Sequence, residues 1–191
     1  MKISICHYSF HRRYVAEGWD LDRLCHEVAA LDVQALDFHV RYLGDVKDSA
    51  KRVNAALKKS GLTLSGLSLS TNFNIPDQAK FQEEIQKTIE WMNVASEVGA
   101  PVSRIFGGGL KRLEVDEQAK SDAFARVIEA LGILSVKAKE SGLVLALENH
   151  GGLPCTGEEQ VEMLKAVGSD YVQATIDVGN YMSGGQEGVE G

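Results

Sequence analysis

Two apolar segments of the sequence each end in residues that can carry out chemistry. Residues 144–147 are apolar and are followed by Glu148, an amide and His150, and residues 172–176 are followed by Asp177. An uninterrupted apolar run is typical of a strand buried on both faces of a parallel sheet. Because side chains alternate along a strand, Glu148 and His150 share one face. We therefore expect two strands to deliver carboxylates to one site.

The chemistry that Glu148 and Asp177 suggest is divalent metal binding combined with proton transfer. Hard cations such as Mg²⁺ and Mn²⁺ take oxygen ligands, and carboxylates at adjacent strand ends can provide them. Such a cation could hold neighbouring oxygens of a sugar, and Glu148 could then move a proton at the carbon beside a carbonyl. The alternative is structural, because both carboxylates could instead cap backbone amides or pair with Arg104.

Other polar residues near the expected strand ends are candidates for substrate binding. His150 could ligate a metal, donate to a substrate oxygen or hydrogen-bond within its loop. His39 could line the pocket or form a structural pair with the aspartate two residues before it. Arg104 could bind an anionic substrate group, with a buried ion pair as the alternative. Asn72 and Asn180 are candidates for hydrogen bonds to the substrate.

A run of glycines at 107–109 lies close to Lys111 and Arg112 in the sequence. Successive backbone N–H groups in such a run could cradle a phosphate. The run lacks the P-loop pattern, however, and a tight turn beside the site is the alternative that we favour.

The elements that must position these residues repeat the order strand, polar loop, helix and glycine. Strands are expected at 2–7, 35–39, 62–69, 102–106, 144–148 and 172–177. Helices are expected to begin near residues 20, 48, 76, 116 and 156, with residues 8–14 forming a loop. Helical spacing places Leu31 and Val161 on buried faces. The repeat of roughly 30 to 40 residues is the size of a strand–helix crossover unit.

Such repeats build either an open doubly wound sheet or a (β/α)₈ barrel. The glycine-rich phosphate fingerprint is absent after the first strand, and most strands end in polar residues, which favours the barrel. We therefore predict an α/β fold, a TIM barrel in which residues 1–191 form one incomplete domain of six units. A full barrel has eight units and typically about 250 residues. The chain is then a fragment, or a homo-oligomer or swapped partner covers its open sheet edges.

Composition narrows the classes of partner. The 191 residues are 44% hydrophobic and 25% charged, as in an ordinary soluble globular protein. The net charge of −7 argues against a nucleic-acid binder. No apolar run approaches the roughly 18 residues of a membrane span. Three scattered cysteines without metal-ligand spacing predict reduced thiols and a cytoplasmic location.

Three short segments resemble one known family. They are Arg104-Ile105-Phe106-Gly107-Gly108, Glu148-Asn149-His150-Gly151-Gly152 and Asp177-Val178-Gly179-Asn180. Together they resemble the sugar phosphate isomerase/epimerase superfamily, whose xylose-isomerase-like TIM barrels are related to the class II AP endonucleases. The resemblance implies a divalent metal, Mn²⁺ or Mg²⁺ with Zn²⁺ as an alternative, and makes Glu148 and Asp177 two of its four protein ligands. It also implies that Glu148 is a catalytic acid/base group.

The same resemblance implies a small-molecule sugar or sugar phosphate as substrate of a metal-dependent isomerase or epimerase. The other two metal ligands of the family, a histidine and a glutamate from the seventh and eighth strands, have no counterpart in this chain. The family also often has histidine at the position of Asn180. We therefore expect the chain alone to bind metal weakly and to be inactive. An inosose dehydratase-like lyase and a non-catalytic barrel that serves as a binding or interaction module are the alternatives.

Overall fold

The computed structural model describes residues 3–111, 114–183 and 185–186 of the chain. Strands and helices alternate along the described residues. The strands are β1 (Ser4–Cys6), β2 (Ala35–His39), β3 (Thr63–Ser68), β4 (Val102–Phe106), β5 (Gly108–Gly109), β6 (Val144–Glu148), β7 (Gly152–Leu153) and β8 (Val172–Thr175). The α-helices are α1 (His11–Ala16), α2 (Leu21–Ala29), α3 (Val46–Ser60), α4 (Gln78–Glu97), α5 (Glu117–Ser141), α6 (Gly157–Val167) and α7 (Val178–Ser183). Short 3₁₀ helices, η1 (His7–Phe10) and η2 (Val40–Tyr42), follow β1 and β2.

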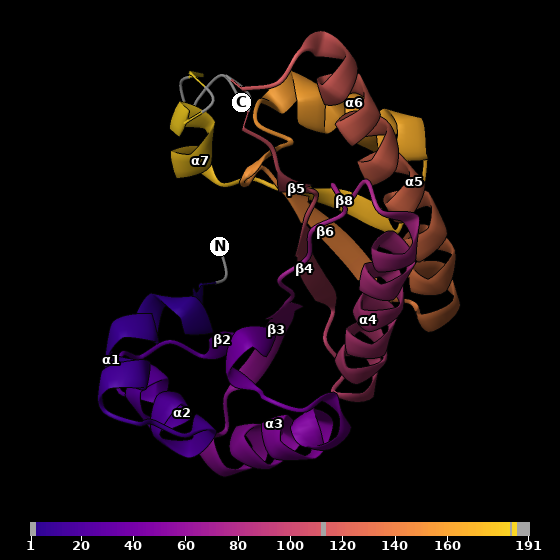
Figure 1. Ribbon diagram of the computed structural model, residues 1–191. Helices are drawn as coiled ribbons and strands as arrows, with labels where there is room; N and C mark the ends of the chain where they lie inside the picture. Colours follow the sequence, from indigo (N-terminus) through magenta and orange to yellow (C-terminus); the bar gives the residue numbers. More distant parts are fainter. Residues whose placement is uncertain (1–2, 112–113, 184, 187–191) are drawn as a thin grey trace.

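The long strands form one parallel arc in chain order. β1, β2 and β3 pair side by side, as do β4, β6 and β8. The two groups adjoin where the backbone N–H of Leu69, just after β3, donates to the carbonyl of Arg104 in β4 over 2.8 Å. Helices α3 to α6 lie on the outer side of the arc (Figure 1). This is the predicted α/β architecture, a TIM barrel with six βα units within the described residues.

Alternation along each strand separates the hydrophobic core from the inner side of the arc. Leu36 and Phe38 of β2 are fully buried in the hydrophobic core. Leu145 and Leu147 of β6 are buried there in the same way. Asp37, His39 and Glu148, which alternate with these leucine and phenylalanine residues, line a cavity on the other side. The same strands therefore build the core and the site, as the period of two predicts.

Aspartates begin several helices where the sequence predicts a start. The side chain of Asp20 accepts the N–H of Arg23 at the start of α2, and Asp116 caps α5 in the same way. An aspartate at this position satisfies a backbone donor that the first helical turn leaves free. The helix expected from residue 48 begins earlier, at Val46, because Asp45 is its cap.

Other expectations of local structure were wrong. Residues 8–14, expected to form a loop, belong to η1 and α1. Leu31 is 57% exposed because α2 ends at Ala29, two residues before it. Val161 is 48% exposed, whereas Gln160 is buried and donates to the carbonyls of β6 and β8. That polar contact sets the face that α6 turns toward the sheet.

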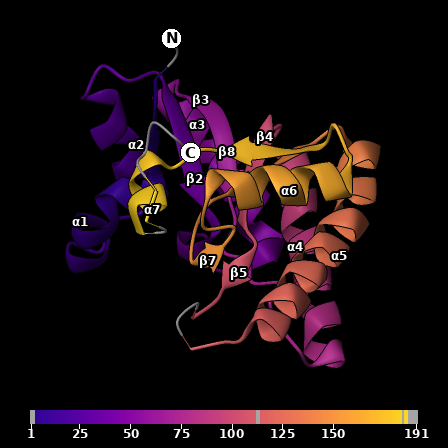
Figure 2. The same cartoon turned by 90° about the horizontal axis from the view of Figure 1, so that it is seen from above.

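Figure 2 shows the arc from above, with β5 and β7 side by side near α6. The arc ends at β1 and β8, whose outer edges carry no strand partner among the described residues. Covering of these edges by a second copy or a swapped partner stays a prediction. No helix in the described part of the chain is long and apolar enough to cross a membrane.

Candidate functional site

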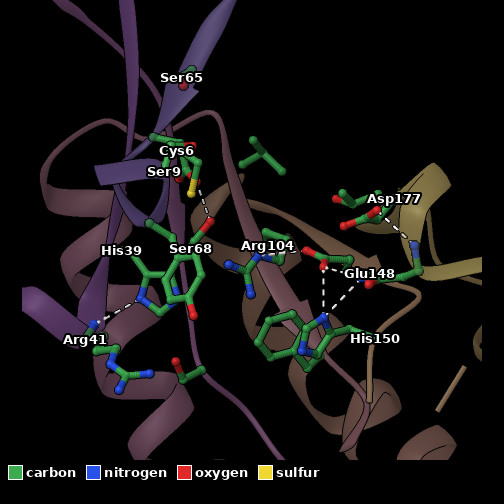
Figure 3. A pocket seen from close by; sticks show the side chains of 18 residues that line it. Cys6, Ser9, His39, Arg41, Ser65, Ser68, Arg104, Glu148, His150 and Asp177 are labelled. Carbon is green, nitrogen blue, oxygen red and sulfur yellow. Dashed lines mark hydrogen bonds and ion pairs between the residues drawn. The ribbon is translucent and has the colours of Figure 1, made fainter. Parts of the chain in front are cut away.

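A cavity of about 630 Å³ lies on the inner side of the arc. Its wall includes the last residue of each long parallel strand, namely Cys6, His39, Ser68, Phe106, Glu148 and Thr175. Parallel strands of one sheet end at the same rim, which is where the chemistry of α/β barrels is usually found. The segments that follow the strands add further polar residues, among them Arg41 of η2, His150, Asp177 and Asn180 of α7. The expected convergence of strand ends is therefore present (Figure 3).

Glu148 lies between a cation and an imidazole. Its Oε2 is 3.1 Å from Nε of Arg104, and its Oε1 is 3.3 Å from Nδ1 of His150. The amide of Asn180 donates to the same Oε1 over 3.2 Å. Burial raises the pKa of Glu148, while the charges of Arg104 and His150 oppose the rise. A carboxyl group with a raised pKa is closer to the range of an acid/base catalyst working near neutral pH.

Arg104 forms the ion pair that the sequence left open as an alternative. Besides Glu148, its Nη1 donates to the carbonyl of Leu69 over 3.1 Å, and its guanidinium lies 4.1 Å from the centre of the Phe106 ring. These contacts hold the group between β3 and β4. An anion-binding role for Arg104 would have to compete with its bond to Glu148.

Asp177 and Asn149 join the ends of β6 and β8. The Asn149 amide donates to the carbonyl of Asp177 over 2.8 Å and accepts its N–H over 2.8 Å. The Asp177 carboxylate accepts the N–H groups of Gly179 and Asn180, so it caps α7. The expected alternative, a carboxylate that caps backbone amides, is thus also realised. The sequence analysis assigned no role to Asn149. An amide directly after a strand could have indicated a side chain that hydrogen-bonds the backbone of a neighbouring strand end.

His150 and Asn180 both border the cavity beside Glu148. The sequence predicts this position because each residue closely follows the end of an expected strand. The His150 ring stacks on Phe106 with 4.2 Å between centroids and 21° between planes. Its Nδ1 lies 3.1 Å from the Asn180 amide nitrogen. These two side chains and Glu148 form one connected group that borders the cavity. Figure 3 shows Glu148 and His150 on the same wall.

His39 lies on the opposite wall, with Arg41 (Figure 3). Its Nδ1 accepts the backbone N–H of Arg41 over 3.1 Å. Burial, together with the positive charges of Arg104 and Arg41, lowers the pKa of His39 to about 4. The imidazole is therefore neutral at physiological pH. It forms no pair with Asp37, which was one alternative for it.

Asp37 and Cys6 border the cavity deeper in the arc. Ser68 donates its hydroxyl proton to Oδ2 of Asp37. Burial raises the pKa of Asp37 and, helped by the charge of Asp37, raises that of Cys6 to about 12. A thiol with such a pKa stays protonated, so Cys6 is not a nucleophile.

Asn72 and the glycine run lie away from the cavity. Asn72 accepts the backbone N–H of Asn74 with its own side chain, as in a turn, and it is not among the residues that line this cavity. A Cβ on Gly107 would lie 2.3 Å from the carbonyl oxygen of Leu153, and one on Gly108 would lie 2.3 Å from Oδ1 of Asn72. The glycines thus permit the close approach of β5 to its neighbours. Lys111 pairs with Glu114, and Arg112 lies outside the described residues.

The residues around Glu148 include the type of ligand that a divalent metal prefers, but too few such ligands to complete a site. Glu148 and Asp177 offer carboxylate oxygens, which hard cations prefer. The oxygens of Glu148 already contact Arg104 and His150, and one oxygen of Asp177 caps α7. Within the described ranges, no group of three or more His, Cys, Asp or Glu residues is placed to hold a metal ion. These residues alone therefore do not form a complete metal centre.

Comparison with known proteins identifies the fold family. A family model described as a xylose isomerase-like TIM barrel matches residues 25–190. No curated protein matches the chain.

Several solved structures share the fold. The probable 3-DHS dehydratase AsbF from Bacillus anthracis is 18% identical, with a TM-score of 0.74 over 99% of this chain and 67% of that one. D-psicose 3-epimerase with D-tagatose from Clostridium cellulolyticum H10 is 16% identical, with a TM-score of 0.72 over 91% and 62%. A Mycobacterium smegmatis protein in complex with magnesium is 19% identical, with a TM-score of 0.60 over 83% and 56%. This chain thus spans between 56% and 67% of their lengths.

Proposed function

The chain belongs to the xylose isomerase-like TIM barrel family, and from that premise we propose that it binds a sugar and carries the proton-transfer group of an isomerase or epimerase. The observation that carries the proposal is the position of Glu148 at the end of β6, facing a cavity bordered by the ends of the other parallel strands. In this proposal Glu148 removes or returns the proton on a carbon next to a carbonyl group. A structural neighbour that holds D-tagatose supports a sugar as the substrate class.

The contacts of Glu148 suit this role. Burial disfavours its charged form, which raises its pKa and strengthens it as a base once ionised. Arg104 counteracts the rise, so that an ionised fraction is available. The same guanidinium can offset negative charge that develops on a carbonyl oxygen as the proton leaves. His150 and Asn180, beside Glu148, are placed to hydrogen-bond hydroxyl groups of a sugar.

We propose Glu148 and Asp177 as the carboxylates that this chain contributes to a divalent metal, Mn²⁺ or Mg²⁺. Both border the cavity, and the M. smegmatis neighbour is a magnesium complex. A bound metal would polarise a carbonyl group and orient adjacent sugar oxygens. Asn149 positions the backbone of Asp177 against the end of β6, so that its carboxylate stays close to Glu148.

Hydrogen exchange in D₂O tests the proposal. The chain is incubated with D-fructose or D-tagatose and Mn²⁺, and ¹H NMR follows deuterium incorporation at the carbon beside the carbonyl. Because two of the four metal ligands expected of the family have no counterpart here, we expect no complete turnover but slow exchange above the protein-free rate, and Glu148→Gln should lower it to the protein-free rate. Glu83→Gln, which changes an exposed glutamate on α4, is the matched control and should exchange like the wild type. No exchange with either sugar, or full exchange in Glu148→Gln, contradicts the proposal.

A dehydratase is the second candidate, because the dehydratase from B. anthracis matches 99% of this chain. Dehydration also begins with removal of a proton beside a carbonyl group, so Glu148 would keep its role. The two functions differ in their products. Loss of water leaves a conjugated double bond that absorbs in the ultraviolet, whereas epimerisation and isomerisation do not. The non-catalytic alternative predicts sugar binding that Glu148→Gln leaves intact, without any exchange.

A further inference from the structure

The wall of the cavity opposite Glu148 carries hydrogen-bond donors for which the described part of the chain provides no partner. We propose that His39 and Arg41 form an anion subsite that takes a terminal phosphate or carboxylate group of the substrate. The proposal deepens the proposed function, because it makes the substrate a sugar phosphate or sugar acid whose other end reaches Glu148.

His39 supplies a neutral donor that points at the cavity. The side chain is 4% exposed and lines the cavity. Its Nδ1 accepts the N–H of Arg41, so the proton of the neutral ring is on Nε2. Among the described residues Nε2 has no hydrogen-bond partner, yet it is not cut off from the cavity, unlike the nitrogens of His7. Its N–H is therefore open to the cavity, where it can donate to an acceptor that enters from outside the protein.

Arg41 supplies the charge. It follows β2 within η2 and lines the same cavity. Its guanidinium makes no ion pair or hydrogen bond with any described residue. The nearby acids are engaged elsewhere: Glu148 pairs with Arg104, and Asp37 accepts from Ser68. Arg41 is exposed, so its guanidinium is accessible to an anion that enters the cavity.

The combination selects an anion rather than a neutral hydroxyl group. A guanidinium and an N–H can both donate, and neither can accept, so they suit an anion, which only accepts, better than a hydroxyl group, whose own donor they leave without an acceptor. Arginine binds phosphate and carboxylate oxygens through paired, charge-assisted hydrogen bonds. Figure 3 shows His39 and Arg41 across the cavity from Glu148 and His150, so an extended substrate can contact both walls.

Anion binding without any sugar or metal tests the subsite. Inorganic phosphate, and separately acetate, is titrated into the chain at constant low ionic strength, with chloride as the balancing anion, and heat is measured by calorimetry. Removing one charge-assisted contact should weaken binding about 10-fold or more, so Arg41→Gln should lose that much affinity and Arg41→Lys less. Arg12→Gln removes an exposed arginine outside the cavity and should stay within about twofold of the wild type.

Chemical modification gives a second readout that needs no variant. Phenylglyoxal modifies arginine side chains, and mass spectrometry locates the products. Bound phosphate or acetate should protect Arg41 and leave the modification of Arg12 unchanged. Stronger protection by phosphate assigns a sugar phosphate, and stronger protection by acetate assigns a sugar acid.

The subsite is wrong if neither anion binds, if Arg12→Gln loses as much affinity as Arg41→Gln, or if Arg41 is not protected. Its failure is separable from that of the proposed function. Anion binding that persists where no sugar shows deuterium exchange rejects the isomerase and keeps the subsite. Deuterium exchange that depends on Glu148, in a chain that binds neither anion, rejects the subsite and keeps the proposed function.

Discussion

Replacing Arg104 by methionine tests the electrostatics at the centre of the site. The substitution keeps an unbranched side chain of similar length but removes the guanidinium. Glu148 then loses the cation 3.1 Å from its Oε2, and the carbonyl of Leu69 loses a donor at 3.1 Å. Both lost contacts lie where β3, β4 and β6 meet.

The expected loss of stability follows from burial rather than from distance. The side chains of Arg104 and Glu148 are 14% and 12% exposed, so methionine leaves a buried carboxylate without its cation. Breaking such a pair costs about 3–5 kcal/mol of unfolding free energy. Lys59 and Asp22 approach more closely, at 2.6 Å, but are 70% and 47% exposed. Solvent screens that pair, so Lys59→Met is a control that should change stability little.

The loss should also depend on pH. Burial already raises the pKa of Glu148, and without Arg104 the pKa rises further. An acid whose folded pKa lies above its unfolded pKa holds a proton in the folded state that the unfolded state has lost. Stability therefore falls as the pH rises through that window. The deficit of Arg104→Met should be smaller at pH 5, where Glu148 is protonated more readily, than at pH 8.

Urea unfolding at both pH values measures these differences. A deficit below about 1 kcal/mol at pH 8 would refute the reasoning, because it would place the pair among solvent-screened surface contacts. A deficit that is equally large at pH 5 and pH 8 would also refute it, because the lost stability would then come from packing or the Leu69 hydrogen bond and not from the charge of Glu148.

Two further predictions concern acid stability and metal binding. Burial lowers the pKa of His7 to about 3, so its contribution to stability is complete above its ordinary pKa of about 6.5 and is lost as the pH falls toward 3. Between pH 7 and pH 4.5 this loss amounts to about 3 kcal/mol, and His7→Phe should unfold in urea with a pH dependence flatter by that amount; equal slopes would contradict the burial argument. Mn²⁺ should bind the chain weakly in calorimetry, because oxygens of Glu148 and Asp177 already contact other groups of the protein. The double variant Glu148→Gln with Asp177→Asn removes both carboxylates and should abolish the heat of binding. Tight binding that survives both substitutions would place the metal elsewhere.

The strand ends could be predicted because their signals are local. An apolar run followed at once by a polar residue marks both the strand and its end, as at Leu147 and Glu148. Parallel pairing then brings the ends to one rim without further information. Helix starts were equally visible, because Asp20 and Asp116 cap helices by bonds within one turn.

The missed features depend on contacts between distant segments. Residues 8–14 form helix around His7, whose ring packs against Tyr14, Tyr42 and Phe38, and no local periodicity reveals that cluster. Arg41 lies two residues beyond the end of β2, where the alternation rule no longer applies. Asn72 was a candidate because it follows the strand expected at 62–69, but β3 ends earlier, at Ser68, and Asn72 lies in a turn that does not line the cavity.

The positive charge of Arg104 affects the pKa values of groups in both walls of the cavity. Its charge opposes the pKa rise that burial imposes on Glu148 and on Asp37, and it adds to the lowering that burial imposes on His39. One buried cation thus favours ionised acids on one side and a neutral donor on the other. A substrate carbonyl between these walls would meet a base and donors at the same time, which is what removal of a proton beside a carbonyl requires. Because both effects come from one guanidinium, losing it should raise the pKa of Glu148 and that of His39 together, so that both groups hold a proton more readily.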